Sequence, residues 1–325
     1  MTSATLTVWC NMPLTEKALG ELRAGLGLHH LVRAVEMPTY NQPIGRPDPH
    51  LLEADVVFGQ PEVDQCVASA QLLWVHLASA GYTTFSDAGA RALLIARGIP
   101  VTTSSSVYAE PCAQHALAFM LAGARQFHRS QRAQAISHAW DTVPTRAASF
   151  LLKGQTVLLV GYGAIAKRLA ELLSPFGLRL VGFRRRPRGD EPIEVRPVVE
   201  LGEWLSSADC VVDILPAATE TAGFFDEAKF TAMKPGATFI KIGRGAKVDE
   251  AALLAALRDR LGAAYLDVTS IEPLPPEHPL WSAPNCFITP HVAGGHGDEY
   301  SRLVALFLEN LDRFLRGQPL VGRVY

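Results

Sequence analysis

The sequence predicts an α/β protein of two doubly wound domains, each built on a parallel sheet. The chain has 325 residues, too many for one ordinary hydrophobic core, so about two domains are expected. Short apolar runs alternate with segments of helical periodicity along most of the chain, which is the pattern of βα units. One apolar run, at 157–160, passes into glycines and then into a helical pattern, as the first βα turn of a nucleotide-binding sheet does.

Composition places the chain among ordinary globular proteins. Hydrophobic residues make up 48%, charged residues 19%, and the formal net charge is −2, so nothing in the charge favours nucleic acid or a membrane surface as a partner. The five cysteines are widely spread and lack CxxC spacing, which predicts neither a disulfide framework nor a metal site. We find no secretion-signal pattern and no apolar run of transmembrane length, and we expect a cytoplasmic protein.

The first hundred residues read as short strands that alternate with helices. Residues 104–106 are all serine and read as a polar linker. The apolar helix expected after them suits a buried core or a subunit interface. The expected strands lie at 6–8, 54–59, 72–77 and 99–102, and the expected helices lie at 15–26, capped by Thr15, and 88–97.

The strand at 72–77 ends in a turn of small residues, Ser79, Ala80 and Gly81. Ligands of open α/β sheets bind at the carboxyl ends of the strands, so the N–H groups of this turn are candidate contacts for an anion. A loop chosen only for its tight geometry explains the same residues equally well.

The glycine turn after 157–160 has the features of a pyrophosphate site. Gly161 permits the turn, and Gly163 lets the backbone approach the phosphates. Ala164 and Ile165 open the helix, whose free N–H groups and positive dipole end face an anion. Ala166 fills the third small position, which the fingerprint allows. A βα turn without a ligand is the alternative.

The next expected strand, at 178–183, runs into Arg184, Arg185 and Arg186. A carboxylate at this point would accept a hydrogen bond from the ribose 2′-OH of NAD(H), whereas arginine accommodates the 2′-phosphate of NADP(H). We therefore expect NADP(H) to be preferred, while arginine does not exclude NAD(H). A solvated basic loop is the alternative.

Each of the last three expected strands delivers one ionisable residue at or just beyond its carboxyl end, namely Arg244, Glu272 and His291. These ends meet at one edge of a parallel sheet, the edge at which the pyrophosphate turn opens. An earlier strand runs into Pro216. The four strands are expected at 210–215, 238–242, 263–268 and 286–290.

These three residue types suit hydride transfer at C2 of a 2-keto or 2-hydroxy acid. The planar guanidinium of Arg244 would bind the substrate carboxylate and polarise the keto oxygen. His291 would protonate that oxygen, or act as the base in the reverse direction. Glu272 would bind the second ring nitrogen and fix the tautomer. Each of these three residues alone has an ordinary structural explanation. Their occurrence at three successive strand ends makes coincidence a poor explanation for the set.

Several motifs resemble the D-isomer-specific 2-hydroxyacid dehydrogenase family, which includes glyoxylate/hydroxypyruvate reductases and phosphoglycerate dehydrogenases. The resemblance covers most of residues 72 to 295, although Ala218 replaces a common threonine. The motifs are VGYGAIAKRLAELLSPFG (160–177), MKPGATFIKIGRGAKVDEAALLAAL (233–257), YLDVTSIEPLPPEHPLW (265–281) and NCFITPHVAGG (285–295), with weaker support from LLWVHLASAGY (72–82) and AEPCAQHALAFMLA (109–122).

The resemblance implies a flavodoxin-like substrate domain (1–103 and 293–325), a Rossmann dinucleotide-binding domain (104–292), a cleft between them and a homodimer. It implies that Arg244, Glu272 and His291 form the catalytic set and that Ser79, Ala80 and Gly81 lie against the substrate carboxylate. The implied cofactor contacts are Gly161, Gly163, Ala164, Ile165, Arg184, Arg185, Arg186, Pro216, Asp267 at the nicotinamide amide, and His291.

We therefore expect an NAD(P)-dependent oxidoreductase that prefers NADP(H) and reduces small 2-keto acids, such as glyoxylate or hydroxypyruvate, to D-2-hydroxy acids. The alternative is a dinucleotide-sensing, corepressor-like binding protein with little turnover, because a fold does not fix a function.

Overall fold

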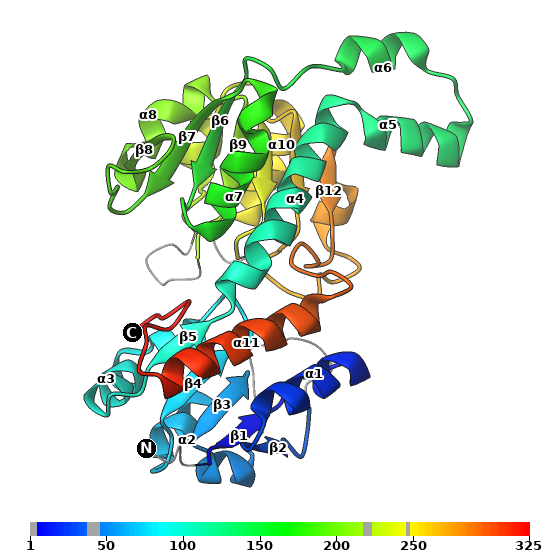
Figure 1. Ribbon diagram of the computed structural model, residues 1–325. Helices are drawn as coiled ribbons and strands as arrows, with labels where there is room; N and C mark the ends of the chain where they lie inside the picture. Colours follow the sequence, from blue (N-terminus) through cyan, green and yellow to red (C-terminus); the bar gives the residue numbers. More distant parts are fainter. Residues whose placement is uncertain (1–4, 38–45, 217–222, 245–247) are drawn as a thin grey trace. The chain divides into compact units, whose positions relative to one another are not determined.

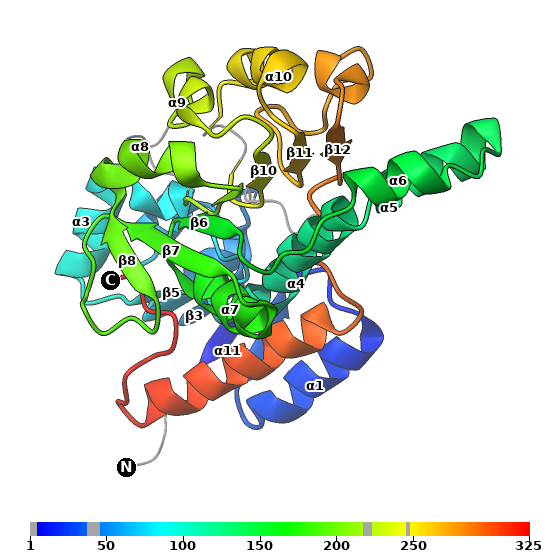
Figure 2. The same ribbon diagram turned by 90° about the horizontal axis from the view of Figure 1, so that it is seen from above.

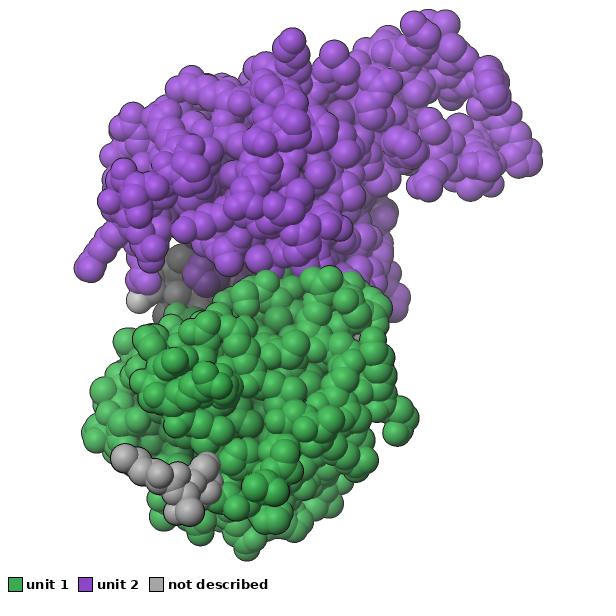
Figure 3. Space-filling model, viewed as in Figure 1, with its two compact units in different colours: residues 1–108, 296–325 green, residues 109–295 purple. Residues whose placement is uncertain are grey.

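The computed structural model describes residues 5–37, 46–216, 223–244 and 248–325. The chain forms two compact units, residues 1–108 with 296–325 and residues 109–295 (Figure 3). These divisions lie a few residues from the expected ones, and the substrate and dinucleotide roles of the two units stay predictions.

The first unit contains a parallel sheet of five strands in the order β2-β1-β3-β4-β5. This is the strand order of flavodoxin-like folds. The strands are β1 (Thr7–Cys10), β2 (His30–Arg33), β3 (Val56–Gly59), β4 (Trp74–Leu77) and β5 (Val101–Thr103), and the helices are α1 (Glu16–Leu26), α2 (Val63–Ala68), α3 (Ala88–Ala96) and α11 (Glu299–Leu315).

Both faces of this sheet are covered, because alternate side chains point to opposite faces. On one face, Phe307 of α11 stacks on Phe58 and Trp74, with ring centroids 4.4 and 5.3 Å away. On the other face, Val57 and Val75 belong to a core cluster that includes residues of α2 and α3. Helix α1 packs beside α11 (Figure 1).

The second unit contains a parallel sheet of seven strands in the order β12-β11-β10-β9-β6-β7-β8. Numbered from β6, this is the doubly wound Rossmann order with one more strand. The strands are β6 (Thr156–Val160), β7 (Arg179–Arg184), β8 (Glu194–Pro197), β9 (Cys210–Asp213), β10 (Thr238–Lys241), β11 (Ala263–Leu266) and β12 (Cys286–Ile288).

Helices flank both faces of the second sheet as well (Figure 2). The helices α8, α9 and α10 cover one face, where Phe239, Leu253 and Phe230 pack in one core cluster. The other face carries α4 and α7, and Phe119 of α4 lies 5.1 Å from Tyr265 of β11. The bounds are α4 (Ser105–Ala124), α5 (Phe127–Arg132), α6 (Thr142–Ala148), α7 (Ala164–Leu173), α8 (Leu201–Trp204), α9 (Glu227–Ala232) and α10 (Glu250–Asp259).

The two-sheet α/β fold class is confirmed, and so is the cap of α1, where Thr15 Oγ1 accepts a hydrogen bond from the Ala18 N–H. The prediction of a polar linker at 104–106 is wrong. Ser105 begins α4, and Ser104 is fully buried, with its hydroxyl bonded to the Leu77 carbonyl.

Three further findings concern membrane spans, metal sites and disulfides. Among the described helices, none is long and apolar enough to cross a membrane. No group of histidine, cysteine and acidic side chains in the described part of the chain could hold a metal ion. All five cysteines are described, and each carries a free thiol.

Candidate active site

The glycine turn after β6 has the shape of a pyrophosphate site. Gly161 has a φ of 99°, and a Cβ built there would lie 2.7 Å from the Ile214 carbonyl oxygen, so a larger residue does not fit. The space around Gly163 is open to 4 Å, and Gly163 is the N-cap of α7. The first N–H groups of α7, at Ala164 and Ile165, have no acceptor within the helix. The turn therefore fits an anion, and the contacts themselves stay a prediction.

The arginine run lies at the end of β7 and in the loop after it. Arg184, the last residue of the strand, is half-buried and lies 3.3 Å from Glu191. Arg185 and Arg186 are exposed, and no hydrogen bond or ion pair joins them to another described residue. Pro216 is exposed just after β9, and Ala218 lies outside the described residues.

Glu272 and His291 are brought together, as predicted. His291 Nδ1 lies 2.6 Å from Glu272 Oε2, and the other carboxylate oxygen accepts a hydrogen bond from the Thr269 N–H at 3.0 Å. The pair is accessible, with side chains 49% and 36% exposed. A histidine held through Nδ1 presents Nε2 for proton transfer.

The charge of Arg244 acts on Glu272. Although burial raises the pKa of Glu272, the hydrogen bond and charge of His291, the Thr269 N–H and the charge of Arg244 together hold it below its usual range. The Arg244 guanidinium donates a hydrogen bond to the Gly243 carbonyl and is half-buried. Glu272 and His291 are therefore in direct contact, and Arg244 adds a favourable charge to the surroundings of Glu272.

Asp267 holds the turn that carries His291. Its carboxylate accepts hydrogen bonds from the Thr289 hydroxyl at 2.6 Å and from the N–H groups of Val292 and Ala293 at 2.9 and 3.0 Å. The turn needs this support because His291 has a φ of 53°, a left-handed backbone that few non-glycine residues adopt. The predicted contact of Asp267 with a nicotinamide amide stays a prediction.

His115 of α4 also reaches this turn, a contact that no sequence motif indicates. Its Nε2 lies 3.0 Å from the Thr289 hydroxyl and 3.7 Å from Asp267. Burial lowers the pKa of His115, against the opposing charge of Asp267. Only the fold joins these residues, since 174 positions separate His115 from Thr289.

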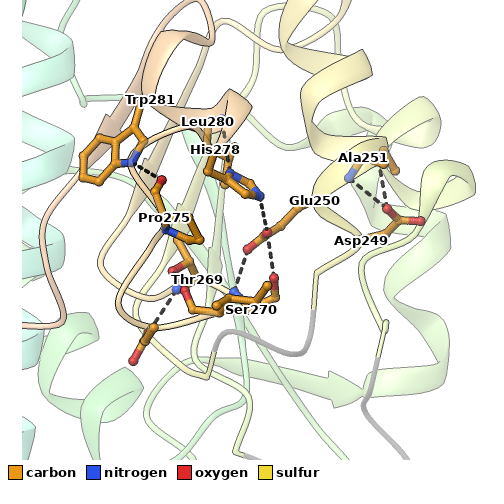
Figure 4. A network of polar contacts seen from close by, with 12 residues as sticks. Asp249, Glu250, Ala251, Thr269, Ser270, Pro275, His278, Leu280 and Trp281 are labelled. Carbon is orange, nitrogen blue, oxygen red and sulfur yellow. Dashed lines mark hydrogen bonds and ion pairs between the residues drawn. The ribbon is translucent and has the colours of Figure 1, made fainter.

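A polar network holds the loop that carries Glu272 (Figure 4). Glu250, the first residue of α10, accepts hydrogen bonds from the Ser270 N–H at 2.6 Å and the Ser270 hydroxyl at 2.7 Å. His278 Nε2 lies 3.5 Å from the same carboxylate. Further along the loop, the indole N–H of Trp281 donates to the Pro275 carbonyl at 2.9 Å. The loop therefore has bonded partners on both sides of Glu272.

The turn of Ser79, Ala80 and Gly81 belongs to the first unit and directly follows β4 and Ala78. The Ser79 hydroxyl donates to the Gly81 carbonyl at 2.6 Å, and the Ser104 N–H donates to the Ser79 carbonyl at 3.0 Å. Hydrogen bonds within the turn and from Ser104 thus fix its conformation. The contact of this turn with a substrate carboxylate stays a prediction.

Comparison with known proteins identifies the family of the chain. Residues 117–293 match the family model described as D-isomer specific 2-hydroxyacid dehydrogenase, NAD binding domain. A glyoxylate reductase from Aeropyrum pernix is 33% identical over 229 residues, which cover 68% of each chain.

Solved structures share the whole fold. A D-isomer specific 2-hydroxyacid dehydrogenase family protein from Aeromonas salmonicida has a TM-score of 0.77 at 29% identity, with 99% of both chains covered. An NADPH-dependent glyoxylate/hydroxypyruvate reductase from Sinorhizobium meliloti, in complex with NADP and malonate, has a TM-score of 0.76 at 25% identity, with 99% of this chain and 97% of that chain covered. This chain belongs to the D-isomer-specific 2-hydroxyacid dehydrogenase family.

Proposed function

We propose that this protein is an NADP(H)-preferring reductase of small 2-keto acids, such as glyoxylate or hydroxypyruvate, and that it forms the D-2-hydroxy acid where the product is chiral. The observation that carries the proposal is the accessible Glu272–His291 pair, with the Arg244 charge acting on Glu272. Relatives named glyoxylate reductase and glyoxylate/hydroxypyruvate reductase support this choice of substrate.

The residues divide the work as their chemistry dictates. Arg244 binds the substrate carboxylate with a planar pair of N–H donors and favours negative charge on the keto oxygen. His291 Nε2 delivers the proton to that oxygen, and Glu272 fixes the ring and stabilises its charged form. The Ser79–Gly81 turn adds N–H donors for the carboxylate. The dinucleotide, when bound, supplies the hydride.

The cofactor assignment rests on the fit of two segments. Gly161 permits the tight turn against the Ile214 carbonyl, and the open space around Gly163 leaves room for a pyrophosphate. The exposed guanidiniums of Arg185 and Arg186 suit a 2′-phosphate, and the relative from Sinorhizobium meliloti binds NADP. The other proposed cofactor contacts are Ala164, Ile165, Arg184, Pro216, Asp267 and His291.

A substrate panel tests the proposal. Oxidation of NADPH and NADH is followed by absorbance with glyoxylate, hydroxypyruvate, pyruvate, and branched and phenyl 2-keto acids. We expect turnover with glyoxylate or hydroxypyruvate and a higher kcat/KM with NADPH. Tight dinucleotide binding without oxidation by any 2-keto acid would overturn the reductase and favour the corepressor-like sensor.

We further propose a homodimer formed through an arm of the second unit. The segment with α5 and α6 extends away from the rest of that unit (Figures 1 and 2), and it exposes Phe127, Ile136, Trp140 and Val143 by 59, 72, 94 and 77%. Such a concentration of apolar surface is typical of an interface. Light scattering after size-exclusion chromatography should give twice the chain mass, and Trp140→Ala should weaken the dimer. A monomer at micromolar concentration would contradict this proposal.

The cytoplasm stays our proposed location. Five free thiols are typical of a reducing compartment, and thiol titration of protein purified under non-reducing conditions should find all five reactive after unfolding.

A further inference from the structure

The sequence has no acid directly after β7, but the fold supplies one. Arg184 ends this strand, at the point where a nucleotide-binding sheet meets the adenosine ribose. The carboxylate of Glu191 lies 3.3 Å from the Arg184 guanidinium, and the Glu191 side chain is only 4% exposed. The first of the three arginines therefore already has an anionic partner, whereas Arg185 and Arg186 are exposed.

The carboxylate of Glu191 is fixed in place. Its Oε1 accepts a hydrogen bond from the Arg188 N–H at 2.9 Å, and its Oε2 accepts one from the Gly189 N–H at 2.8 Å. Led by the Arg188 hydrogen bond, these contacts hold the pKa of Glu191 below its usual range despite desolvation. Glu191 is thus a fixed negative charge at neutral pH, not a mobile surface acid.

The glycine turn packs against the strand that Arg184 ends. Tyr162, between Gly161 and Gly163, is 2% exposed, and its ring packs on β7, where a Cβ on Gly182 would lie 2.7 Å from it. Burial first, and then the charges of Glu191 and Glu171, raise the pKa of Tyr162. The glycine turn and the Arg184–Glu191 pair therefore adjoin the same strand, β7.

We propose that Glu191 is a specificity residue for the 2′ substituent of the nucleotide and that it limits the preference for NADPH. A fixed carboxylate beside Arg184 repels a 2′-phosphate and cancels the nearest guanidinium, whereas it tolerates a 2′-hydroxyl. Arg185 and Arg186 remain to attract the phosphate. The inference rests on the proposed dinucleotide-binding function and concerns binding alone.

Binding of two adenosine fragments tests the inference without any turnover. Calorimetry compares adenosine 2′,5′-bisphosphate with 5′-AMP on the wild type and on Glu191→Gln, which keeps an oxygen able to accept the N–H bonds. We expect the bisphosphate to bind Glu191→Gln on the order of fivefold more tightly, with 5′-AMP nearly unchanged. The ratio of NADPH affinity to NADH affinity should rise in Glu191→Gln by a similar factor.

Asp190→Asn is the matched control. It removes the same charge from the same loop, at an exposed residue that has no hydrogen bond or ion pair with another described residue, and should leave the ratio near that of the wild type. An equal gain in this control, or an unchanged ratio in Glu191→Gln, would overturn the inference while the reductase proposal stands. Failure of every nucleotide to bind the wild type would overturn both.

A double variant separates an indirect role of Arg184 from direct phosphate binding. If Glu191 acts by cancelling Arg184, Arg184→Gln weakens bisphosphate binding because it leaves Glu191 unopposed, and Arg184→Gln/Glu191→Gln restores it. A double variant that binds as weakly as Arg184→Gln would show direct phosphate binding by Arg184 and contradict the inference. The double variant also serves if Glu191→Gln alone does not fold, since it removes both charges of the pair.

Discussion

Two pairs of ionisable residues lie at the ends of neighbouring strands of the second sheet, and they differ in their exposure to solvent. Lys241 ends β10 and lies 2.7 Å from Asp213, which ends β9. Glu272 and His291 follow β11 and β12 and lie 2.6 Å apart. The distances are nearly equal, but the first pair is 2% and 0% exposed and the second 36% and 49%.

The difference in exposure separates structure from chemistry. The buried pair is closed to solvent. Asp213 also accepts a hydrogen bond from the Leu215 N–H at 3.0 Å, so it fixes the start of the loop after β9. The accessible pair can exchange a proton with a ligand while Thr269 holds Glu272 in place. Substitutions in the first pair should therefore change stability, and substitutions in the second should change turnover.

Lys241→Met should give the largest effect. It leaves Asp213 buried without a counter-charge, and breaking such a pair costs about 3–5 kcal/mol in the free energy of unfolding. Chemical unfolding followed by tryptophan fluorescence measures this loss. The double variant Lys241→Met/Asp213→Leu should recover most of it, because no lone charge remains. A loss below about 1 kcal/mol in the single variant would mean that the pair is not what stabilises these strand ends.

Glu272→Gln should change kcat and leave stability almost intact. The amide still bonds the imidazole but no longer stabilises its charged form, so we expect kcat to fall on the order of 10- to 100-fold, within the range of general acid–base effects. Steady-state kinetics with glyoxylate and NADPH measures the fall. Unchanged kcat together with lower stability would place this pair in the same class as Lys241 and Asp213.

His76 extends the comparison to the first unit. It is fully buried between Thr102 and Ser104, and burial lowers its pKa to about 3. The unfolded chain binds a proton near pH 6.5 and the folded chain does not, so stability falls as the pH drops from about 6.5 towards 3. Urea unfolding at pH 7.5 and pH 5 should show a loss of roughly 2 kcal/mol. The loss of stability between pH 7.5 and pH 5 should be smaller in His76→Gln than in the wild type. If the wild type and the variant lost the same stability, the loss would come from titratable groups other than His76.

The sequence was informative where chemistry follows local order. Gly161 and Thr15 act within their own turns, and Arg244, Glu272 and His291 each follow a strand, so parallel pairing alone predicts that their ends meet. The short edge strands β2 and β8 were missed. The four residues of β8, Glu-Val-Arg-Pro, are too few and too polar for their hydrophobic alternation to distinguish a strand from a loop.

The sequence was uninformative where contacts depend on register and on loop closure. Lys241 meets Asp213 across 28 positions because the two strand ends align, and Glu191 reaches Arg184 because the loop turns back. The serines at 104–106 illustrate a different error. Serine favours helix starts as well as linkers, and only the structure shows that α4 begins there.

One measurement tests most directly whether the exposed pair carries the chemistry. His291→Ala is compared with the wild type for NADPH affinity, thermal stability and oxidation of NADPH by glyoxylate on the same preparations. We predict a fall in kcat of about two to four orders of magnitude, with NADPH affinity and melting temperature nearly unchanged. Turnover equal to that of the wild type would contradict the account and remove His291 from the mechanism.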